Sequence, residues 1–198
     1  MALHELLAAR RMVRSFDGTG VDESQLGDLC AQSLWAPTAG NAAGVRMHIV
    51  GHALVSDYFE VATDEAWRHS ARRAPGLQRA GAVVLVTSKR SAYLDRYGED
   101  DKSSSGLSDE RSWPVPYWHT DAAMATMALL LLLEERAIAA TLWGNFRREQ
   151  EILEWAHIDG EDLFASVLLG HADGNDVASA SLERDVPPRS SRVTQVEP

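Results

Sequence analysis

Hydrophobic residues recur along the first part of the chain at the three- and four-residue spacing that is typical of amphipathic helices. Residues 2–12 place their leucines on one stripe, which predicts a short first helix. A second helix with its own apolar stripe follows, and either Asp22 or Ser24 can cap it. This helix has to end before Pro37, because proline disfavours a helical conformation in the residue that precedes it.

Denser apolar runs predict the strands. Residues 45–50 are typical of a strand with mixed burial, and residues 82–87 form a β-branched run that indicates a buried central strand. Residues 54–73 lie between them and follow a helical spacing, which Pro75-Gly76 is expected to break. Residues 164–169 are the candidate last strand.

The longest apolar run extends from Ala122 to Leu133 and predicts a buried helix over residues 119–136. Thr126 interrupts the run and Glu134 closes it, so it is too short to cross a bilayer. A short apolar segment at 137–143 and a helical pattern at 149–155 follow it.

Two segments depart from these patterns. Residues from about 90 to 116 are rich in Gly, Ser, Asp and Pro and are expected to form a functional or mobile loop excursion. The tail, from about 173 to 198, has no apolar period of its own, so we expect it to lie across another surface. Because no repeat or second core pattern is present, residues 1–198 are expected to form a single domain.

Charge and composition exclude several classes of function. The net charge of −10 would repel a phosphate backbone, so nucleic acid is not an expected partner. Cys30 is the only cysteine, which excludes an internal disulfide and makes a reducing cytoplasm the expected location. The first residues lack the long apolar segment of a secretory signal. The seven histidines show no metal-ligand spacing, and no metal site is expected.

In this acidic chain, Arg10, Arg11 and Arg14 form the densest basic cluster. Their segment, 10–16, resembles the opening motif of the nitroreductase-like FMN-dependent flavoproteins, commonly an arginine pair, a serine, and then a basic residue before an aromatic one. Met12 stands where that family has its serine. The resemblance implies that the arginines hold the flavin phosphate, a role that suits guanidinium groups because they pair bidentately with phosphate oxygens. Taken alone, such a cluster is more often the solvated face of a short helix.

A second segment, at the matching distance, resembles the family's Ala-Pro-Ser-x-x-Asn loop. The residues of this segment that carry the resemblance are Pro37, Thr38, Ala39 and Asn41. In the family this loop contacts the edge of the isoalloxazine ring from the neighbouring subunit, which requires small residues for close approach. The family often continues with Gln-Pro-Trp, where this chain has Ala43-Gly44-Val45. The alternative interpretation is an ordinary helix-to-strand turn.

Residues 137–146 resemble a third feature of the family, a strand that ends in a glycine turn. Backbone N–H groups there reach N5 and O4 of the flavin and stabilise the charge that arrives on the reduced ring. The resemblance places Trp143 and Gly144 in this role.

The end of the chain gives the fourth resemblance, between residues 167–173 and the family's last strand with its Gly-Tyr or Gly-His terminus. Arg184 stands where the family commonly places a lysine or arginine on the flavin phosphate. The family's second basic position is Val186 here, and Arg189 or Arg192 is the alternative phosphate ligand.

The order and spacing of the four motifs extend the resemblance over nearly the whole chain. It implies an α+β fold with a central, mainly antiparallel sheet flanked by helices, and an intertwined homodimer. It also implies ping-pong hydride transfer from NADPH or NADH, through N5 of FMN, to a nitroaromatic, quinone or similar small acceptor, with no catalytic side chain required. Two other functions stay open: a flavin oxidase or dehydrogenase that desaturates a small metabolite or cyclic peptide, and a flavin-binding or storage protein without turnover.

Trp113, Tyr117 and Trp118 lie where the excursion leads into the long buried helix. Their aromatic faces make them candidates for stacking on a planar substrate above the flavin. The other interpretation is that they anchor the excursion onto the dimer.

Overall fold

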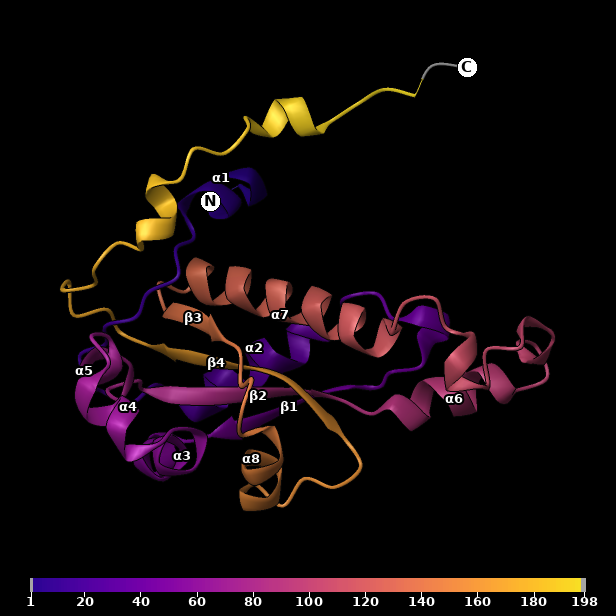
Figure 1. Cartoon of the computed structure of the whole chain (residues 1–198), viewed down its shortest axis with the longest axis horizontal. Helices are drawn as coiled ribbons and strands as arrows, with labels where there is room; N and C mark the ends of the chain where they lie inside the picture. The colour runs from indigo at the N-terminus through magenta and orange to yellow at the C-terminus, as the bar shows by residue number, and fades with distance from the viewer. Residues whose placement is uncertain (1, 197–198) are drawn as a thin grey trace.

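The computed structural model describes residues 2–196, which are built around a four-stranded sheet. The strands are β1 (Val45–Val50), β2 (Ala82–Ser88), β3 (Ala139–Trp143) and β4 (Asp162–Gly170). They lie in the order β1-β2-β4-β3, and each is antiparallel to its neighbours (Figure 1). β1 and β3 are therefore the edges. The α+β fold with a central antiparallel sheet, predicted from the sequence, is confirmed.

The helices pack on both faces of this sheet. α2 and α7 cover one face, and α3 and α8 cover the other (Figure 1). The α-helices of the described residues are α1 (Leu3–Ala9), α2 (Glu23–Ser33), α3 (Val55–Ala62), α4 (Glu65–Ser70), α5 (Ala74–Leu77), α6 (Arg90–Gly98), α7 (Tyr117–Glu135) and α8 (Glu149–Trp155).

Strand β2 shows why the sheet is apolar on both faces. Its residues are fully buried along its whole length. Val84 belongs to the cluster under α2 and α7, whereas Val83 and Leu85 belong to the cluster under α3 and α8. Because successive side chains of a strand point to opposite faces, a strand covered on both sides has to be apolar at nearly every position. The β-branched run in the sequence is the direct result of this double burial.

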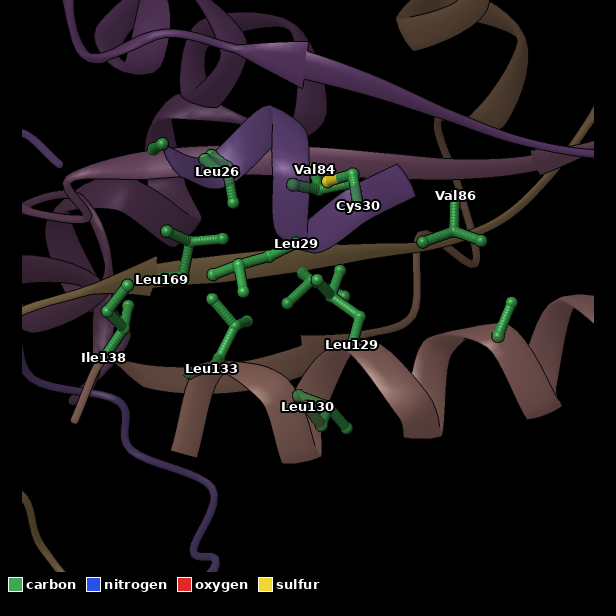
Figure 2. Packing of buried hydrophobic residues seen from close by; sticks show 14 of the residues in the cluster. Leu26, Leu29, Cys30, Val84, Val86, Leu129, Leu130, Leu133, Ile138 and Leu169 are labelled. Carbon is green, nitrogen blue, oxygen red and sulfur yellow. The ribbon is translucent and has the colours of Figure 1, made fainter. Parts of the chain in front are cut away.

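Leucines from the two helices meet over the first of these faces. Leu26 and Leu29 of α2 approach Leu129 and Leu133 of α7, with Leu169 of β4 beneath them (Figure 2). Each of these side chains is at most 1% exposed. Complete burial of a leucine stabilises the fold by about 2 kcal/mol, so this layer fixes α7 on the sheet.

Two predicted boundaries were wrong. The helix expected over 54–73 is broken after α3, because Asp64 accepts a hydrogen bond from the backbone N–H of Trp67 (2.7 Å) and starts α4 as its N-cap. Pro75 does not break the pattern but lies in the first turn of α5, where its missing N–H has no partner to lose.

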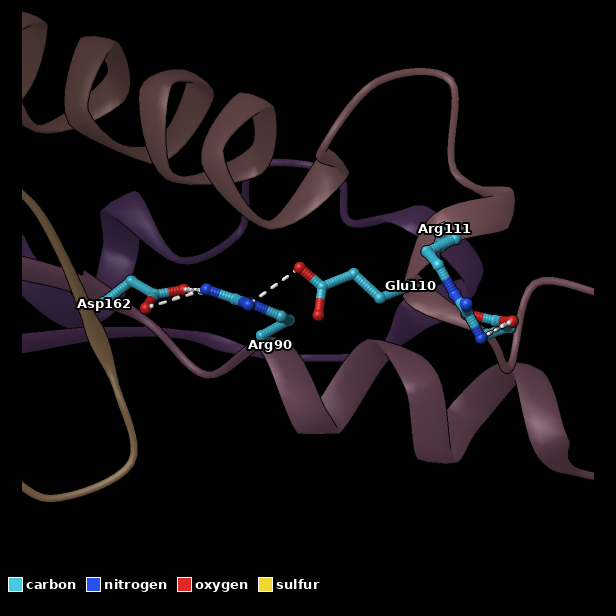
Figure 3. Close-up of polar contacts among 5 residues, drawn as sticks. Arg90, Glu110, Arg111 and Asp162 are labelled. Carbon is cyan, nitrogen blue, oxygen red and sulfur yellow. Dashed lines mark hydrogen bonds and ion pairs between the residues drawn. The ribbon is translucent and has the colours of Figure 1, made fainter.

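The excursion expected at about 90–116 begins with a helix, α6, and only residues 99–116 form an irregular loop with two short 3₁₀ turns. Tyr93 of α6 is fully buried, so a tertiary contact stabilises a segment whose composition favours a loop. Arg90 ties the excursion to the sheet, since it pairs with Asp162 of β4 (2.9 Å) and with Glu110 of the loop (2.7 Å) (Figure 3). Within the loop, Arg111 contacts Asp109.

The other elements lie within a few residues of their predicted bounds, and no helix among residues 2–196 is long and apolar enough to cross a membrane. Of the two cap candidates for α2, the structure selects Asp22, whose side chain accepts a hydrogen bond from the Gln25 backbone N–H (2.8 Å).

Replacement of the α2 cap is expected to destabilise the protein. Asp22→Ala leaves the Gln25 N–H without its acceptor and should lower the free energy of unfolding by about 1 kcal/mol, measured by chemical denaturation. The matched control is Asp28→Ala, which removes an exposed carboxylate from the same helix. Equal denaturation midpoints for the two variants would contradict a capping role.

The thiol of Cys30 should be inert in the folded protein. Its side chain is 5% exposed in the core, and burial raises the pKa of Cys30 to about 12. At pH 8 only about one thiol in ten thousand is then ionised, and the thiolate is the reactive form. We expect a thiol reagent to leave the native protein unlabelled and to label one site after denaturation. Rapid labelling of the native protein would show that α2 opens away from the sheet.

Candidate active site at the open edge of strand β3

Residues 10–14 run along the open edge of β3. The backbone N–H of Val13 donates to the carbonyl of Ala140 (3.0 Å), and the N–H of Leu142 donates to the Met12 sulfur (3.4 Å). These contacts place the arginine cluster beside the strand that ends at Trp143. Two of the segments that resemble flavin-binding motifs therefore lie on one edge of the sheet, in one chain.

A cavity of about 1110 Å³ opens next to this segment, between α1 and the tail. Four arginines line it, namely Arg10, Arg11, Arg14 and Arg189, together with one carboxylate, Asp176. The cavity thus concentrates positive charge in a chain whose net charge is −10.

The three N-terminal arginines differ in how their guanidinium groups are used. Arg10 has two buried nitrogens, Nε and Nη1, with no hydrogen-bond partner among the described residues. Arg11 donates instead to the carbonyls that end α1, at Ala8 (2.6 Å) and Ala9 (3.0 Å). Because an unpaired buried donor costs free energy, the group most in need of an anionic partner is Arg10.

Arg14 also lies in a crowded positive field. Burial and the nearby Arg73 lower the pKa of the Arg14 guanidinium, and the carboxylate of Asp176 acts in the opposite direction. One of its nitrogens donates to the carbonyl of Met12 (2.9 Å). An anion in the cavity would relieve the repulsion between the two arginines.

The tail lies across this cavity. From its lack of an apolar period, we expected it to lie across another surface. Ser15 donates to the carboxylate of Asp173 (2.8 Å) at the start of the tail, and Arg73 donates to the carbonyl of Val177 (3.2 Å) further along. Of the three tail arginines that the sequence singled out, the structure brings Arg189 to the cavity. Arg184 and Arg192 are exposed and are not among its lining residues.

The end of β3 separates the roles of Trp143 and Gly144. In an edge strand, alternate residues turn their N–H groups outward. Leu142 does so, and the N–H of Trp143 therefore faces β4. Gly144 is the next residue, one position beyond the end of the strand, where the alternation would turn its N–H outward again. The Trp143 side chain stacks on Trp67 (ring centroids 5.3 Å apart), on the face of the sheet that α3 covers. Gly144 is therefore the position that can present a backbone donor at the open edge.

Residues 37–41 form a tight turn that α6 and α7 hold from behind. The Ala39 N–H donates to the carboxylate of Asp121 (2.8 Å), and Arg96 donates to the Gly40 carbonyl (2.9 Å). Gly40 and Asn41 have positive φ angles of 61° and 57°. Thr38 precedes this turn in extended conformation, and Pro37 lies four residues beyond Ser33, the last residue of α2.

Asp121 is the residue of this region that the sequence analysis missed. It is 1% exposed and also accepts a hydrogen bond from the Tyr93 hydroxyl (2.9 Å). Burial raises the pKa of Tyr93, and the nearby carboxylate and hydrogen bond of Asp121 raise it further. A carboxylate at the start of an otherwise apolar helix was the available signal, since a buried charge has to be hydrogen-bonded to be tolerated.

Within one chain the turn and the arginines lie apart. Asp121, which holds the turn, belongs to the first turns of α7, whereas β3 follows the last turn of the same helix. The 19 residues of α7 span about 28 Å at 1.5 Å per residue. Figure 1 shows α6 and its loop at one end of the sheet, and the start of the tail after β4 at the other end.

The aromatic residues of the excursion mainly pack on their own chain. Trp113 contacts the rings of Tyr97 (4.8 Å) and Trp118 (6.0 Å), and its indole N–H donates to the carbonyl of Leu107 (2.7 Å). Trp118 is 4% exposed, while Tyr117 is 42% exposed. The packing favours an anchoring role for the two tryptophans and leaves Tyr117 accessible. Among residues 2–196, no group of His, Cys, Asp and Glu side chains is arranged to hold a metal ion.

Comparisons with known proteins agree with this architecture. The chain superimposes on a candidate nitroreductase from Desulfovibrio desulfuricans in complex with FMN, with a TM-score of 0.72, 16% identity, and coverage of 100% of this chain and 98% of that chain. The nitroreductase CinD from Lactococcus lactis, in complex with chloramphenicol, gives a TM-score of 0.76 at 13% identity and covers 99% of this chain and 100% of that chain. At these identities the likeness concerns the fold alone.

A third solved structure, the enone reductase CLA-ER, gives a TM-score of 0.69 at 16% identity, covering 93% of this chain and 97% of that chain. No curated protein sequence matches the chain. The sequence model of the nitroreductase family matches residues 7–171, a span that includes the arginine segment, the turn at 37–41 and all four strands. The chain belongs to the nitroreductase family.

Proposed function

We propose that the protein is an FMN-dependent oxidoreductase that works as a homodimer, takes electrons from NADPH or NADH, and passes them to a nitroaromatic, a quinone or a similar small acceptor. The observation that carries this proposal is the pair of buried Arg10 nitrogens, Nε and Nη1, that have no partner among the described residues and lie in the cavity beside the open edge of β3. A phosphate monoester would supply the acceptors that this group lacks.

The residues present fit the cofactor. Arg10, Arg14 and Arg189 are the proposed phosphate ligands, while Arg11 keeps α1 in place by binding its final carbonyls. The Gly144 backbone N–H is the proposed donor to the isoalloxazine ring. When bound, FMN supplies the hydride acceptor and donor, so the protein has to position it and exclude water rather than provide a nucleophile.

The proposed dimer brings the turn at 37–41 of one subunit to the arginines of the other. Side chains near both regions are exposed in the single chain although they are apolar, including Leu7 (49%), Trp35 (86%) and Met124 (40%). Burying such residues against a second copy would stabilise the association, and it would complete the cofactor site at the same time.

The ligands of the structural neighbours support the acceptor class. CinD was crystallised with chloramphenicol and with 4-nitrophenol, both of which are nitroaromatics. The enone reductase among the neighbours shows that the same fold also reduces conjugated double bonds. Met12 and Ala43–Val45, where the chain departs from the family, keep two alternatives open: an oxidase or dehydrogenase that desaturates a small metabolite or cyclic peptide, and a flavin-storage protein.

The direction of electron flow is tested with the purified holoprotein under anaerobic conditions. A reductase loses its yellow colour when NADPH or NADH is added and regains it when a nitroaromatic or quinone is supplied. An oxidase keeps its colour with either nicotinamide and loses it only with its own substrate. A storage protein keeps its yellow colour with either nicotinamide and with any candidate substrate.

Removal of the unpaired guanidinium should weaken FMN binding. Arg10→Ala deletes a desolvated partner of the phosphate and is expected to raise the Kd for FMN at least 30-fold, measured by quenching of flavin fluorescence. Arg111→Ala is the matched control, because Arg111 has a 90% exposed side chain and contacts only its neighbour Asp109. Equal FMN affinities in the two variants would exclude Arg10 from the phosphate site.

A mixed dimer should recover activity that two separate variants lack. Arg10→Ala damages the arginine half of the site, and Asn41→Ala damages the turn contributed by the other subunit. When the two variants are mixed and refolded together, one site of each heterodimer receives both intact halves, so NADPH-dependent flavin reduction should return. Failure to complement, although heterodimers form, would place both halves of the site in one subunit.

A further inference from the structure

A closed ring of three side-chain hydrogen bonds lies directly behind the end of β3. The Tyr58 hydroxyl donates to Ser166 Oγ (2.8 Å), Ser166 Oγ donates to Asn145 Oδ1 (2.7 Å), and Asn145 Nδ2 donates to the Tyr58 hydroxyl (3.1 Å). Each of the three groups is both a donor and an acceptor. The direction of every bond is thereby set by the other two, and such bonds polarise and strengthen one another.

The ring is set in the apolar layer under α3 and α8. Tyr58 and Ser166 are fully buried, and the rings of Trp143 and Trp155 lie 6.3 Å from that of Tyr58. Burial raises the pKa of Tyr58 to about 12, so its hydroxyl keeps its proton at neutral pH. A phenylalanine and an alanine would fill most of this space without the cost of desolvating polar groups, so filling the core does not account for the ring.

The ring instead joins three elements at one point. Tyr58 belongs to α3, Ser166 belongs to β4, and Asn145 follows β3 by two residues. Ser166 is also the register partner of Trp143, the last residue of β3. The pairing between β3 and β4 ends at Trp143, and the hydrogen bonds of the ring begin just beyond it. They therefore hold Asn145 in place, on the C-terminal side of Gly144.

We propose that Tyr58, Ser166 and Asn145 are positioning residues that hold the Gly144 backbone N–H at the open edge of β3 and thereby set the reduction potential of the flavin bound there. This inference rests on the proposed function. A donor that is fixed before reduction stabilises the charge that arrives on the ring, whereas a mobile donor has to be ordered at that moment. Trp143 on one side and Asn145 on the other side clamp Gly144.

The test compares two serine variants of the full chain loaded with FMN. Ser166→Ala opens the ring, and Ser88→Ala is the matched control, because Ser88 is also fully buried in a central strand but its hydroxyl has no partner among the described residues. We expect Ser166→Ala to shift the midpoint potential of the bound flavin to a more negative value and to slow its reduction by NADPH about 10-fold, since small misplacements near reacting atoms have effects of this size. The Kd for FMN should change less than about twofold, because the phosphate ligands are untouched. Ser88→Ala should match the native protein in all three measurements.

Tyr58→Phe is the second variant, and it keeps the aromatic ring in the core while it removes two of the three bonds. It should shift the midpoint potential of the bound flavin in the same direction, and it provides the test if Ser166→Ala does not fold. A folded variant of either kind that keeps the native potential and reduction rate would overturn the inference and leave the proposed function intact. A native protein that binds no FMN would overturn both.

Discussion

The open edge of β3 is the constraint on which the candidate site depends. An edge strand presents unpaired N–H and C=O groups that have to find partners. Residues 12 and 13 satisfy the first half of this edge, through the Ala140 carbonyl and the Leu142 N–H, and they carry the arginines with them. The backbone just beyond the strand, from Gly144 onward, receives no such cover from the described N-terminal segment. The same pairing that protects the strand thus places the arginine cluster, the proposed phosphate site, on the edge that leads to Gly144.

Met12 is the position at which the arginine segment departs from the motif that it resembles. In place of the family's serine hydroxyl, a thioether accepts the Leu142 N–H at 3.4 Å. Sulfur is a weak acceptor and cannot donate, so Met12 can cover the strand edge but cannot hydrogen-bond a ligand oxygen as a donor. In the proposed site the polar contacts of the cofactor would come from the guanidinium groups around the cavity and from the backbone. Arg10, with two buried nitrogens that have no partner among the described residues, is the first of these groups.

The sequence predicts the parts of the fold that local physics decides. β2 follows from a doubly buried apolar run, and the start of α2 follows from the cap at Asp22. Helix α6 could not be predicted, because it depends on Tyr93 reaching Asp121, a contact between distant residues. The candidate site also has features that the sequence predicts and features that depend on the tertiary structure. The arginine cluster is visible in the sequence, whereas the direction of the Trp143 N–H and the choice of Arg189 over Arg184 depend on how strands pair and how the tail lies.

The two halves of the proposed site are held in place by different sets of side chains. The donor half is fixed by the ring of Tyr58, Ser166 and Asn145, which is anchored in a central strand of the sheet. The other half, the turn at 37–41, is fixed by Asp121 and Arg96, whose partners are backbone groups of the turn itself. Both halves are therefore preorganised by buried or half-buried polar contacts within a single subunit. If the two halves belong to different subunits, the geometry of the flavin ring is set before the dimer forms, and association only has to bring two finished surfaces together.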